Sequence, residues 1–240
     1  MLFKIVMQSK QLKSLPKFSR FLSHTSASTQ YFDLHYIFFK ENSIKYVKSF
    51  KSLCPRLNTD NKRQAAVLIP LCIVKDEVSL LYTLRTSNLK RNSSQVSFPG
   101  GMHEMDEKLQ DTALRESCEE LGISESSIDI WGSGRFIVSK DIAIMPFLGN
   151  IGVIDPDMLN VNHEEVQYAF AIPLKHFCEP ANCKYTYFRQ KSNRLMVLPV
   201  YTNDYKKIWG MTAYMTWLAL KSIIPEKFTQ SISSSLYKIN

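Results

Sequence analysis

The spacing of hydrophobic and polar residues becomes regular at residue 65, where it predicts a β-hairpin. The segments AAVLIPLCIV (65–74) and VSLLYTLR (78–85) are dominated by aliphatic residues, and the polar stretch Lys75-Asp76-Glu77 separates them. Apolar runs of this length between turn residues are typical of buried strands. We therefore expect two antiparallel strands here, followed by a polar loop over 86–97.

A helix is predicted over roughly residues 108–121, after a Pro-Gly-Gly corner and an acidic loop (103–107). Gly122 stands where a helix-terminating glycine is expected. The apolar face of this helix is predicted by four positions spaced four residues apart, at Leu109, Ala113, Ser117 and Leu121.

Further strands are expected over 128–134, 144–153 and 166–173, and a short helical segment within 172–178. A late hairpin (184–189 with 195–202) precedes a final apolar helix (210–224), which Pro225 ends. Strands outnumber helices, and two helices suffice to cover the faces of a sheet. The pattern therefore favours one α/β layered domain.

Positive charge is concentrated at the front of the chain. Residues 1–64 contain 12 Lys and Arg against 3 Asp and Glu, and residues 65–240 contain 18 against 19. The body therefore has no cationic surplus for nucleic-acid binding, and no such partner is expected.

Residues 1–30 are basic, contain serines and have no acidic residue, which is typical of a mitochondrial transit peptide. The alternative is a tail without a targeting role, in a cytosolic or peroxisomal protein. The last residues lack the Ser-Lys-Leu signal for peroxisomes. Residues 31–64 are interpreted as a basic N-terminal linker segment with a short helix near 43–52, and residues 226–240 as a polar tail.

The cysteine pattern argues against a disulfide-bonded secreted protein, and the apolar runs argue against a membrane-spanning one. The five cysteines form no CxxC pair, and their irregular spacing favours free thiols in a reducing compartment. The apolar runs 65–74 and 211–224 are too short or too interrupted to span a bilayer, so no membrane span is expected.

Three carboxylates crowd the predicted helix. Because each helical residue advances by 100°, Glu116 and Glu120 lie one above the other and Glu119 lies on the adjoining row. Such a patch is repulsive in water unless a cation offsets it, and Mg²⁺ binds through one or two carboxylates together with substrate phosphates. This arrangement suits a metal site, although the three glutamates taken alone favour an ordinary solvated acidic face.

The spacing around these glutamates resembles the signature of the Nudix hydrolases, Gx5Ex7REUxEExGU with U apolar. All seven fixed residues match in register, and Ser117 occupies a position where the signature has an aliphatic residue. The resemblance implies a Nudix fold over 65–225, an α/β/α sandwich with a mixed sheet between helices. It also implies Mg²⁺ or Mn²⁺ as cofactor and a nucleoside diphosphate derivative as the small-molecule substrate.

The resemblance also implies roles for individual residues. Glu116, Glu119 and Glu120 match the positions that hold metal or activate water, and Arg115 and Glu107 match the pair that braces the loop against the helix. For Gly101 we expect a sharp turn and a backbone that approaches the metal and phosphate closely, which a Cβ would obstruct.

The preceding segment LYTLRTSNLKRNSSQVSFPGG (81–101) resembles that of the coenzyme A diphosphatases, with Lys90 in place of an arginine and Ser94 in place of a glycine. Coenzyme A has a 3′-phosphate in addition to its pyrophosphate, which suits a basic cluster beside the metal site. The predicted substrate-binding residues are Arg85, Lys90, Arg91, Phe98 and Gly100.

Downstream, NHEEVQYAFAIPL (162–174) resembles the same family and places Glu165 either at the metal site or at a strand edge. The expected reaction is hydrolysis of coenzyme A or acyl-CoA to 3′,5′-ADP and the corresponding 4′-phosphopantetheine. The alternatives are the same chemistry on NADH or a diadenosine polyphosphate, and a catalytically silent nucleotide-binding module. Whether the chain is a monomer or a homodimer is left open.

Overall fold

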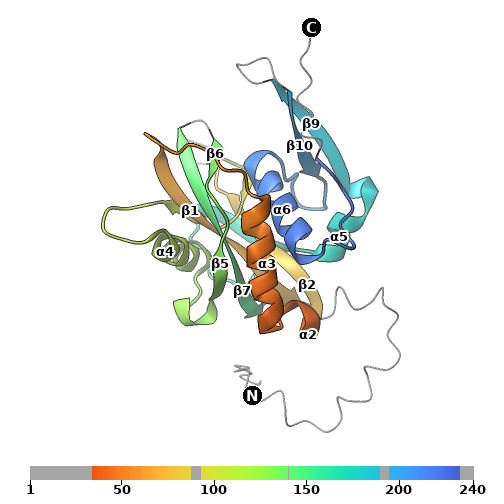
Figure 1. Cartoon of the computed structure of the whole chain (residues 1–240). Coiled ribbons are helices and arrows are strands. Elements are labelled where there is room, and N and C mark those ends of the chain that lie inside the picture. The colour runs from red at the N-terminus through yellow and green to blue at the C-terminus, as the bar shows by residue number, and fades with distance from the viewer. Residues whose placement is uncertain (1–33, 88–92, 140, 190–194, 233–240) are drawn as a thin grey trace, which may run out of the picture.

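The computed structural model of the chain describes residues 34–87, 93–139, 141–189 and 195–232 (Figure 1). The predicted transit peptide, most of the polar tail, and Lys90 and Arg91 lie outside these residues. The described α-helices are α2 (Leu34–Ile37), α3 (Lys40–Leu53), α4 (Leu109–Leu121), α5 (Leu174–Cys178) and α6 (Gly210–Ile223), with 3-10 turns η1 (Glu125–Ser127), η2 (Pro156–Met158) and η3 (Pro180–Asn182). Among the described helices, none is both long and apolar enough to cross a membrane.

A mixed eight-stranded sheet forms the centre of the molecule. Its main path runs β3-β2-β1-β7-β5, while β4 pairs with β1, β6 with β7, and β8 with β2. The β1–β7 pair is parallel and the others are antiparallel. The strands are β1 (Arg63–Val74), β2 (Glu77–Arg85), β3 (Val96–Ser97), β4 (Gly100–Met102), β5 (Asp129–Ser133), β6 (Ile137–Ser139), β7 (Ile142–Val153) and β8 (Val166–Pro173).

A second, two-stranded sheet confirms the predicted late hairpin. It consists of β9 (Cys183–Arg189) and β10 (Leu195–Tyr201), which pair antiparallel. Figure 1 shows this hairpin projecting from the body of the molecule, beyond α5 and α6.

The β1–β2 hairpin is confirmed with a shorter turn than expected. Val74 pairs with Glu77, so only Lys75 and Asp76 connect the strands, and both have positive φ angles (50° and 61°). A two-residue loop of this kind matches the right-handed twist of the strands that it joins. Glu77 therefore belongs to β2.

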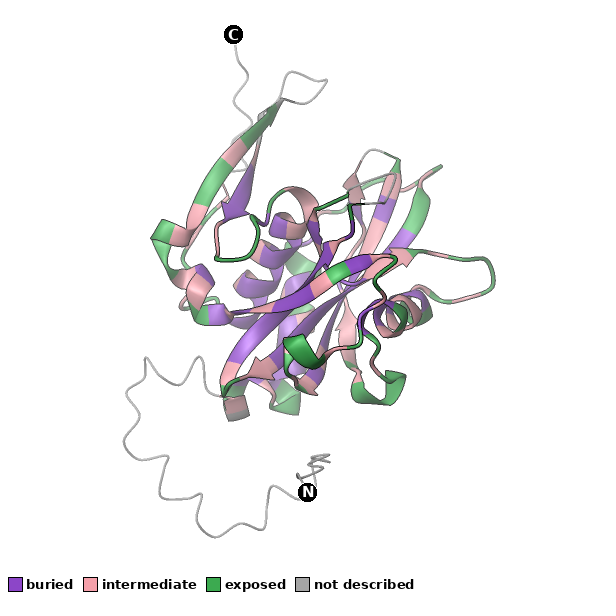
Figure 2. Ribbon diagram, turned by 180° about the vertical axis from the view of Figure 1, so that it is seen from behind, coloured by how far each residue is buried: buried purple, intermediate pink, exposed green. Residues whose placement is uncertain are grey.

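Helices cover both faces of the sheet, which confirms the predicted α/β/α layering (Figure 2). One core cluster lies between α4 and the sheet and includes Ala66, Leu68, Leu81, Ala113, Leu121 and Phe147. The other lies on the α3 and α6 side and includes Phe50, Leu71, Leu80, Tyr82, Phe170 and Leu218.

The short helix expected near 43–52 is confirmed as α3, and residues 34–53 of the segment that we interpreted as a linker pack onto the domain. Helix α3 contacts α6 and β5, and Ile37, Tyr46 and Phe50 are buried in the main core. Lysines recur between the apolar residues of α3, so its apolar face is narrow, and the sequence suggests a helix exposed to solvent. Tertiary packing supplies the stability that such a helix lacks by itself.

Helix α4 begins and ends as the sequence predicts. Lys108 precedes its first turn, and Gly122 follows its last with a φ of 65°. A Cβ at Gly122 would lie 2.2 Å from the carbonyl oxygen of Asn160, so this position requires glycine for space as well as for conformation. Ser117 is fully buried, and its hydroxyl donates to the Ala113 carbonyl at 2.6 Å, so the departure from the Nudix signature leaves no unsatisfied hydroxyl.

Candidate active site

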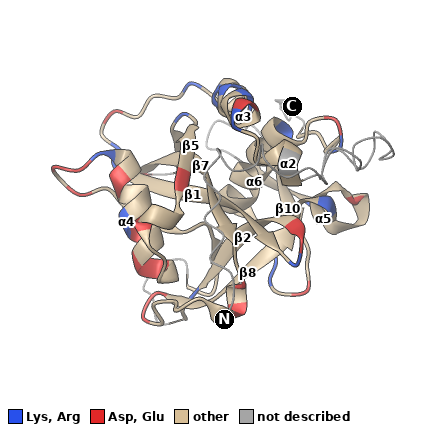
Figure 3. Ribbon diagram, turned by 90° about the horizontal axis from the view of Figure 1, so that it is seen from below, with Lys and Arg blue, Asp and Glu red and all other residues tan. Residues whose placement is uncertain are grey.

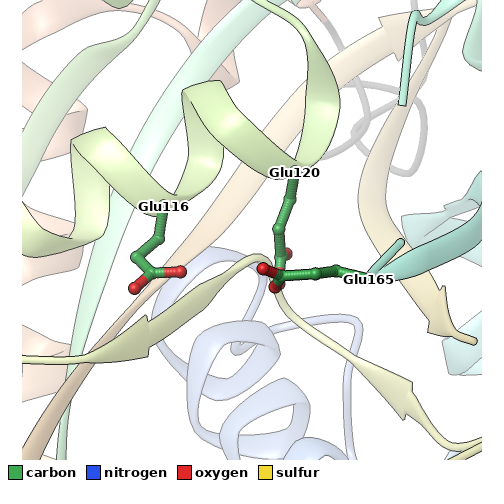
Figure 4. A group of neighbouring side chains, drawn as sticks. All are labelled: Glu116, Glu120 and Glu165. Carbon is green, nitrogen blue, oxygen red and sulfur yellow. The ribbon is translucent and has the colours of Figure 1, made fainter. Parts of the chain in front are cut away.

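The candidate site consists of three carboxylates that two distant parts of the chain bring together. Glu116 and Glu120 project from α4, and Glu165 comes from the turn before β8 (Figure 4). One oxygen from each lies within 4.8 Å of the others. The turn is held to α4 by a backbone hydrogen bond from Asn162 N–H to the Glu120 carbonyl, at 3.1 Å. Of the two readings of Glu165, the structure therefore places it in the carboxylate cluster.

Glu120 is the most unusual member of this cluster because it is a buried carboxyl. The residue is 1% exposed, and neither of its carboxylate oxygens has a hydrogen-bond partner among the described residues. Arg85 Nη1 lies 3.5 Å from its Oε1. Burial raises the pKa of Glu120 to about 8, while the Arg85 guanidinium acts in the opposite direction. A buried carboxyl with one long ion pair and no hydrogen bond is costly, which points to a missing ligand.

The glycine corner makes room for Glu116. A Cβ on Gly101 would lie 2.3 Å from both Cδ and Oε1 of the Glu116 side chain, so glycine lets that carboxylate lie against the β4 backbone. The unusual backbone conformation falls one residue earlier than expected, at Gly100, whose φ is 146°. A Cβ there would lie 2.3 Å from the Ala66 carbonyl oxygen. Gly100 therefore makes the turn, and Gly101 gives space to a site residue.

Glu107 and Arg115 form the predicted link between the acidic loop and α4. Arg115 Nη2 and Nε donate to the two oxygens of Glu107 at 3.1 and 3.3 Å. The pKa of Glu107 is lowered to about 2, first by these hydrogen bonds from Arg115 and then by one from the Glu104 backbone N–H. Arg115 Nη1 also donates to Glu116 Oε1 at 3.1 Å, so the link reaches the carboxylate cluster directly.

Glu119 lies apart from the other two glutamates of α4. Its side chain is 57% exposed, and its carboxylate accepts from Arg115 Nη1 at 3.2 Å. It does not belong to the group of oxygens within 4.8 Å of one another. The expected single patch is thus divided, since Glu120 is buried while Glu119 faces solvent; the metal role of Glu119 stays a prediction. Figure 3 shows the acidic residues spread along α4.

Of the predicted substrate-binding residues that the structure describes, Arg85 lies at the carboxylate cluster and Phe98 does not face solvent. Phe98 is 2% exposed, and its ring stacks on Tyr82 with 4.8 Å between centroids. This burial makes the ring part of the core, and a contact of Phe98 with the substrate stays a prediction. The role of Gly100 toward the substrate stays a prediction. Ser94 has a φ of 55°, which explains why the family pattern has a glycine there.

Two features of the site could not be found from the motif. The ion pair between Arg85 and Glu120 joins the segment before the Nudix signature to the helix within it. Thr112, fully buried on α4, donates to Glu107 Oε1 at 2.7 Å. The only signal in the sequence was its spacing, because Thr112 lies one turn before Glu116 on the row that Glu116 and Glu120 share.

A hard divalent cation fits this donor set. The cluster offers three carboxylates and neither sulfur nor imidazole, and Mg²⁺, Mn²⁺ and Ca²⁺ prefer oxygen ligands. A cation would give the buried Glu120 carboxylate a ligand in addition to its 3.5 Å ion pair with Arg85. A separate cavity of about 340 Å³ beside the end of α3 is lined by none of the predicted site residues.

The comparisons with known proteins agree with this geometry. The model of the NUDIX domain matches residues 62–177. The chain belongs to the Nudix hydrolases. It is 41% identical over 164 residues to the mitochondrial coenzyme A diphosphatase NUDT8 of Homo sapiens, covering 67% of this chain and 70% of the relative. It is 40% identical to the protein of the same name from Mus musculus, covering 70% of this chain and 82% of the relative. Nudix hydrolase 3 of Caenorhabditis elegans is 32% identical over 213 residues, covering 80% of this chain and 88% of the relative.

The buried carboxyl predicts how stability depends on pH without metal. Between about pH 4.5, where an ordinary glutamate titrates, and about pH 8, folded Glu120 retains a proton that the unfolded chain has released. Raising the pH through this window should therefore lower the free energy of unfolding, by at most about 1.4 kcal/mol per pH unit. Thermal melts in EDTA measure this slope. Glu120→Gln should flatten it, and equal slopes for the two proteins would contradict the assignment.

Proposed function

We propose that this Nudix hydrolase cleaves the pyrophosphate of coenzyme A or acyl-CoA. The products are 3′,5′-ADP and 4′-phosphopantetheine or its acyl derivative. The single observation behind the chemistry is the cluster of Glu116, Glu120 and Glu165, whose buried member Glu120 accepts no hydrogen bond from the described residues. The choice of substrate is supported by the relatives at 40–41% identity, which are named coenzyme A diphosphatases, and by Arg85 at the edge of the cluster.

In this proposal Glu116, Glu120 and Glu165 hold Mg²⁺ or Mn²⁺, and Glu119 and the Gly101 backbone remain candidates for further contacts. When bound, such ions neutralise the pyrophosphate oxygens, which otherwise repel a nucleophile, and stabilise the departing phosphate. Arg115 and Glu107 keep Glu116 in place. Which member of the cluster accepts the proton of the attacking water is open; Glu116 and Glu120 are the candidates.

The reaction balances with water as the only co-substrate. A water oxygen forms a bond to one phosphorus of the anhydride, and the bond from that phosphorus to the bridging oxygen breaks. The bridging oxygen leaves on the other phosphate, and the proton of the water passes to a carboxylate and then to solvent. Arg85, with Lys90 and Arg91, is proposed to pair with the anionic groups of the substrate, as expected for guanidinium and phosphate.

We also propose that residues 1–30 direct the chain to the mitochondrial matrix. The basic, acid-free composition of this segment and the two relatives named as mitochondrial support the proposal. Imaging of a fluorescent fusion with and without residues 1–30 tests it. A full-length fusion found in the cytosol or in peroxisomes would contradict the proposal.

The substrate proposal predicts the products. The purified chain, incubated with Mg²⁺ or Mn²⁺ and coenzyme A, should release 3′,5′-ADP and 4′-phosphopantetheine in equal amounts, identified by mass. NADH and diadenosine polyphosphates at the same concentration serve as competing substrates and should give a lower kcat/KM. Absence of 3′,5′-ADP, with turnover of either competitor, would replace coenzyme A by that dinucleotide while leaving the hydrolase chemistry intact.

A further inference from the structure

We infer that Thr112 and His103 are positioning residues, which hold Glu107 and, through Arg115, the carboxylate of Glu116. The inference rests on the proposed metal site, and only its activity readout depends on the substrate. His103 follows β4, and Thr112 lies in the first turns of α4. Neither residue is among the fixed positions of the Nudix signature.

Thr112 is the central member of this chain of contacts. Its hydroxyl oxygen lies 2.7 Å from Glu107 Oε1 and 3.0 Å from His103 Nδ1. It is also 3.4 Å from the Lys108 carbonyl, a weaker contact within the helix. The residue is fully buried. Solvent therefore has no direct route to replace the hydroxyl if it is removed.

Counting hydrogens assigns the direction of each bond. A hydroxyl has one hydrogen, and a carboxylate oxygen can only accept, so the short contact uses the Thr112 hydrogen to bond Glu107. Toward His103 the same oxygen can then only accept, and the hydrogen between them must belong to His103 Nδ1. The geometry therefore fixes the ring of His103 as the tautomer protonated at Nδ1.

This chain of contacts, called the relay below, runs from His103 through Thr112, Glu107 and Arg115 and ends at Glu116 of the carboxylate cluster. Glu107 Oε1 accepts from Thr112, from the Glu104 backbone N–H at 3.0 Å and from Arg115 Nη2 at 3.1 Å. Arg115 then donates through Nη1 to Glu116 at 3.1 Å. A shift of the Glu107 carboxylate would move the guanidinium and with it Glu116. Partners that orient metal-binding residues in this way commonly contribute to metal affinity.

The test measures Mn²⁺ binding to the full chain by electron paramagnetic resonance of the free ion, without substrate. Thr112→Val keeps the shape and removes the hydroxyl, and Thr112→Ser keeps the hydroxyl. The matched control is Thr216→Val, because Thr216 is an equally buried helical threonine on α6 whose hydroxyl bonds Tyr82, outside the site. His103→Ala probes the outer member of the relay.

Thr112→Val should weaken Mn²⁺ binding by about 10-fold and lower kcat with little change in KM for the substrate. Thr112→Ser should stay within about 3-fold of the wild type, and Thr216→Val should lower the melting temperature without changing Mn²⁺ binding. His103→Ala should have a smaller effect, and adding it to Thr112→Val should cost little further, because the hydrogen bond of His103 Nδ1 goes to Thr112 and its distance to Glu107 Oε1 is 4.0 Å.

Nuclear magnetic resonance of the ring nitrogens supplies a readout that does not depend on activity. His103 should be protonated at Nδ1 in the wild type and should lose that preference in Thr112→Val. Unchanged Mn²⁺ binding in Thr112→Val, equal losses in Thr112→Ser, or a neutral ring protonated only at Nε2 would overturn the inference. If coenzyme A is not hydrolysed while these Mn²⁺ and tautomer results hold, the substrate proposal fails and the relay stands.

Discussion

Replacing Glu120 by glutamine should lower kcat/KM by about 10³-fold without lowering the melting temperature of the metal-free protein. The amide keeps the shape of the carboxyl and removes the charge that a divalent ion requires. Losing several kcal/mol of charge stabilisation in the transition state corresponds to that factor. The fold should tolerate the change because Glu120 is a buried carboxyl whose charged form is costly in the absence of metal. Steady-state kinetics with coenzyme A and thermal melts in EDTA measure the two effects.

The matched control is Glu125→Gln, which changes an exposed glutamate in η1 just beyond α4. It removes the same charge from the same end of the domain and should leave kcat/KM within about 2-fold, as surface substitutions usually do. Activity within 10-fold of the wild type in Glu120→Gln would remove this residue from the metal site. A large loss in Glu125→Gln would show that charge in general, not the cluster, controls the rate.

Alanine in place of Gly101 should mainly reduce activity, whereas alanine in place of the adjacent Gly100 should mainly reduce stability. Gly101→Ala should fold and lose about 100-fold in kcat/KM, because the new Cβ would displace the flexible Glu116 carboxylate, and displacements of about 1 Å can cost that much. Gly100→Ala should unfold more easily, by about 1–3 kcal/mol from its backbone conformation alone, and more from the contact with the Ala66 carbonyl. Thermal melts and kinetics separate the two.

Gly152→Ala is the control for backbone strain. Gly152 has a φ of 76°, and nothing lies within 4 Å of the Cβ that alanine would add. The variant should therefore lose stability without losing kcat/KM. Full activity in Gly101→Ala would mean that the carboxylate of Glu116 is free to move without consequence, which would contradict its place in the site.

The parts of the fold that local chemistry determines were predictable from the sequence. The β1–β2 hairpin follows from two aliphatic runs around a polar turn, and α4 follows from its four-residue spacing and from Gly122. Helix α3 was only partly predicted, because its buried residues acquire their meaning from α6 and β5. The short strand β6 was missed, since three residues are too few to show a period.

The site shows the same division between local and tertiary information. The Nudix spacing identified Glu116 and Glu120, and a weaker resemblance identified Glu165, which the structure brings to them. The sequence does not reveal that Glu120 is buried and Glu119 exposed, because one residue along a helix decides between core and solvent. The burial of Phe98 was not predicted for a related reason, since an aromatic residue in a motif serves the core as readily as the substrate.

The central claim is that Glu116, Glu120 and Glu165 together hold the divalent ions of this hydrolase. Anomalous diffraction at the manganese edge, from crystals of the wild type grown with Mn²⁺, tests it most directly. We predict an anomalous peak within bonding distance of oxygens from all three residues, and its loss in crystals of Glu120→Gln. A well-occupied Mn²⁺ elsewhere, with these three carboxylates uncoordinated at a concentration that supports turnover, would contradict the account.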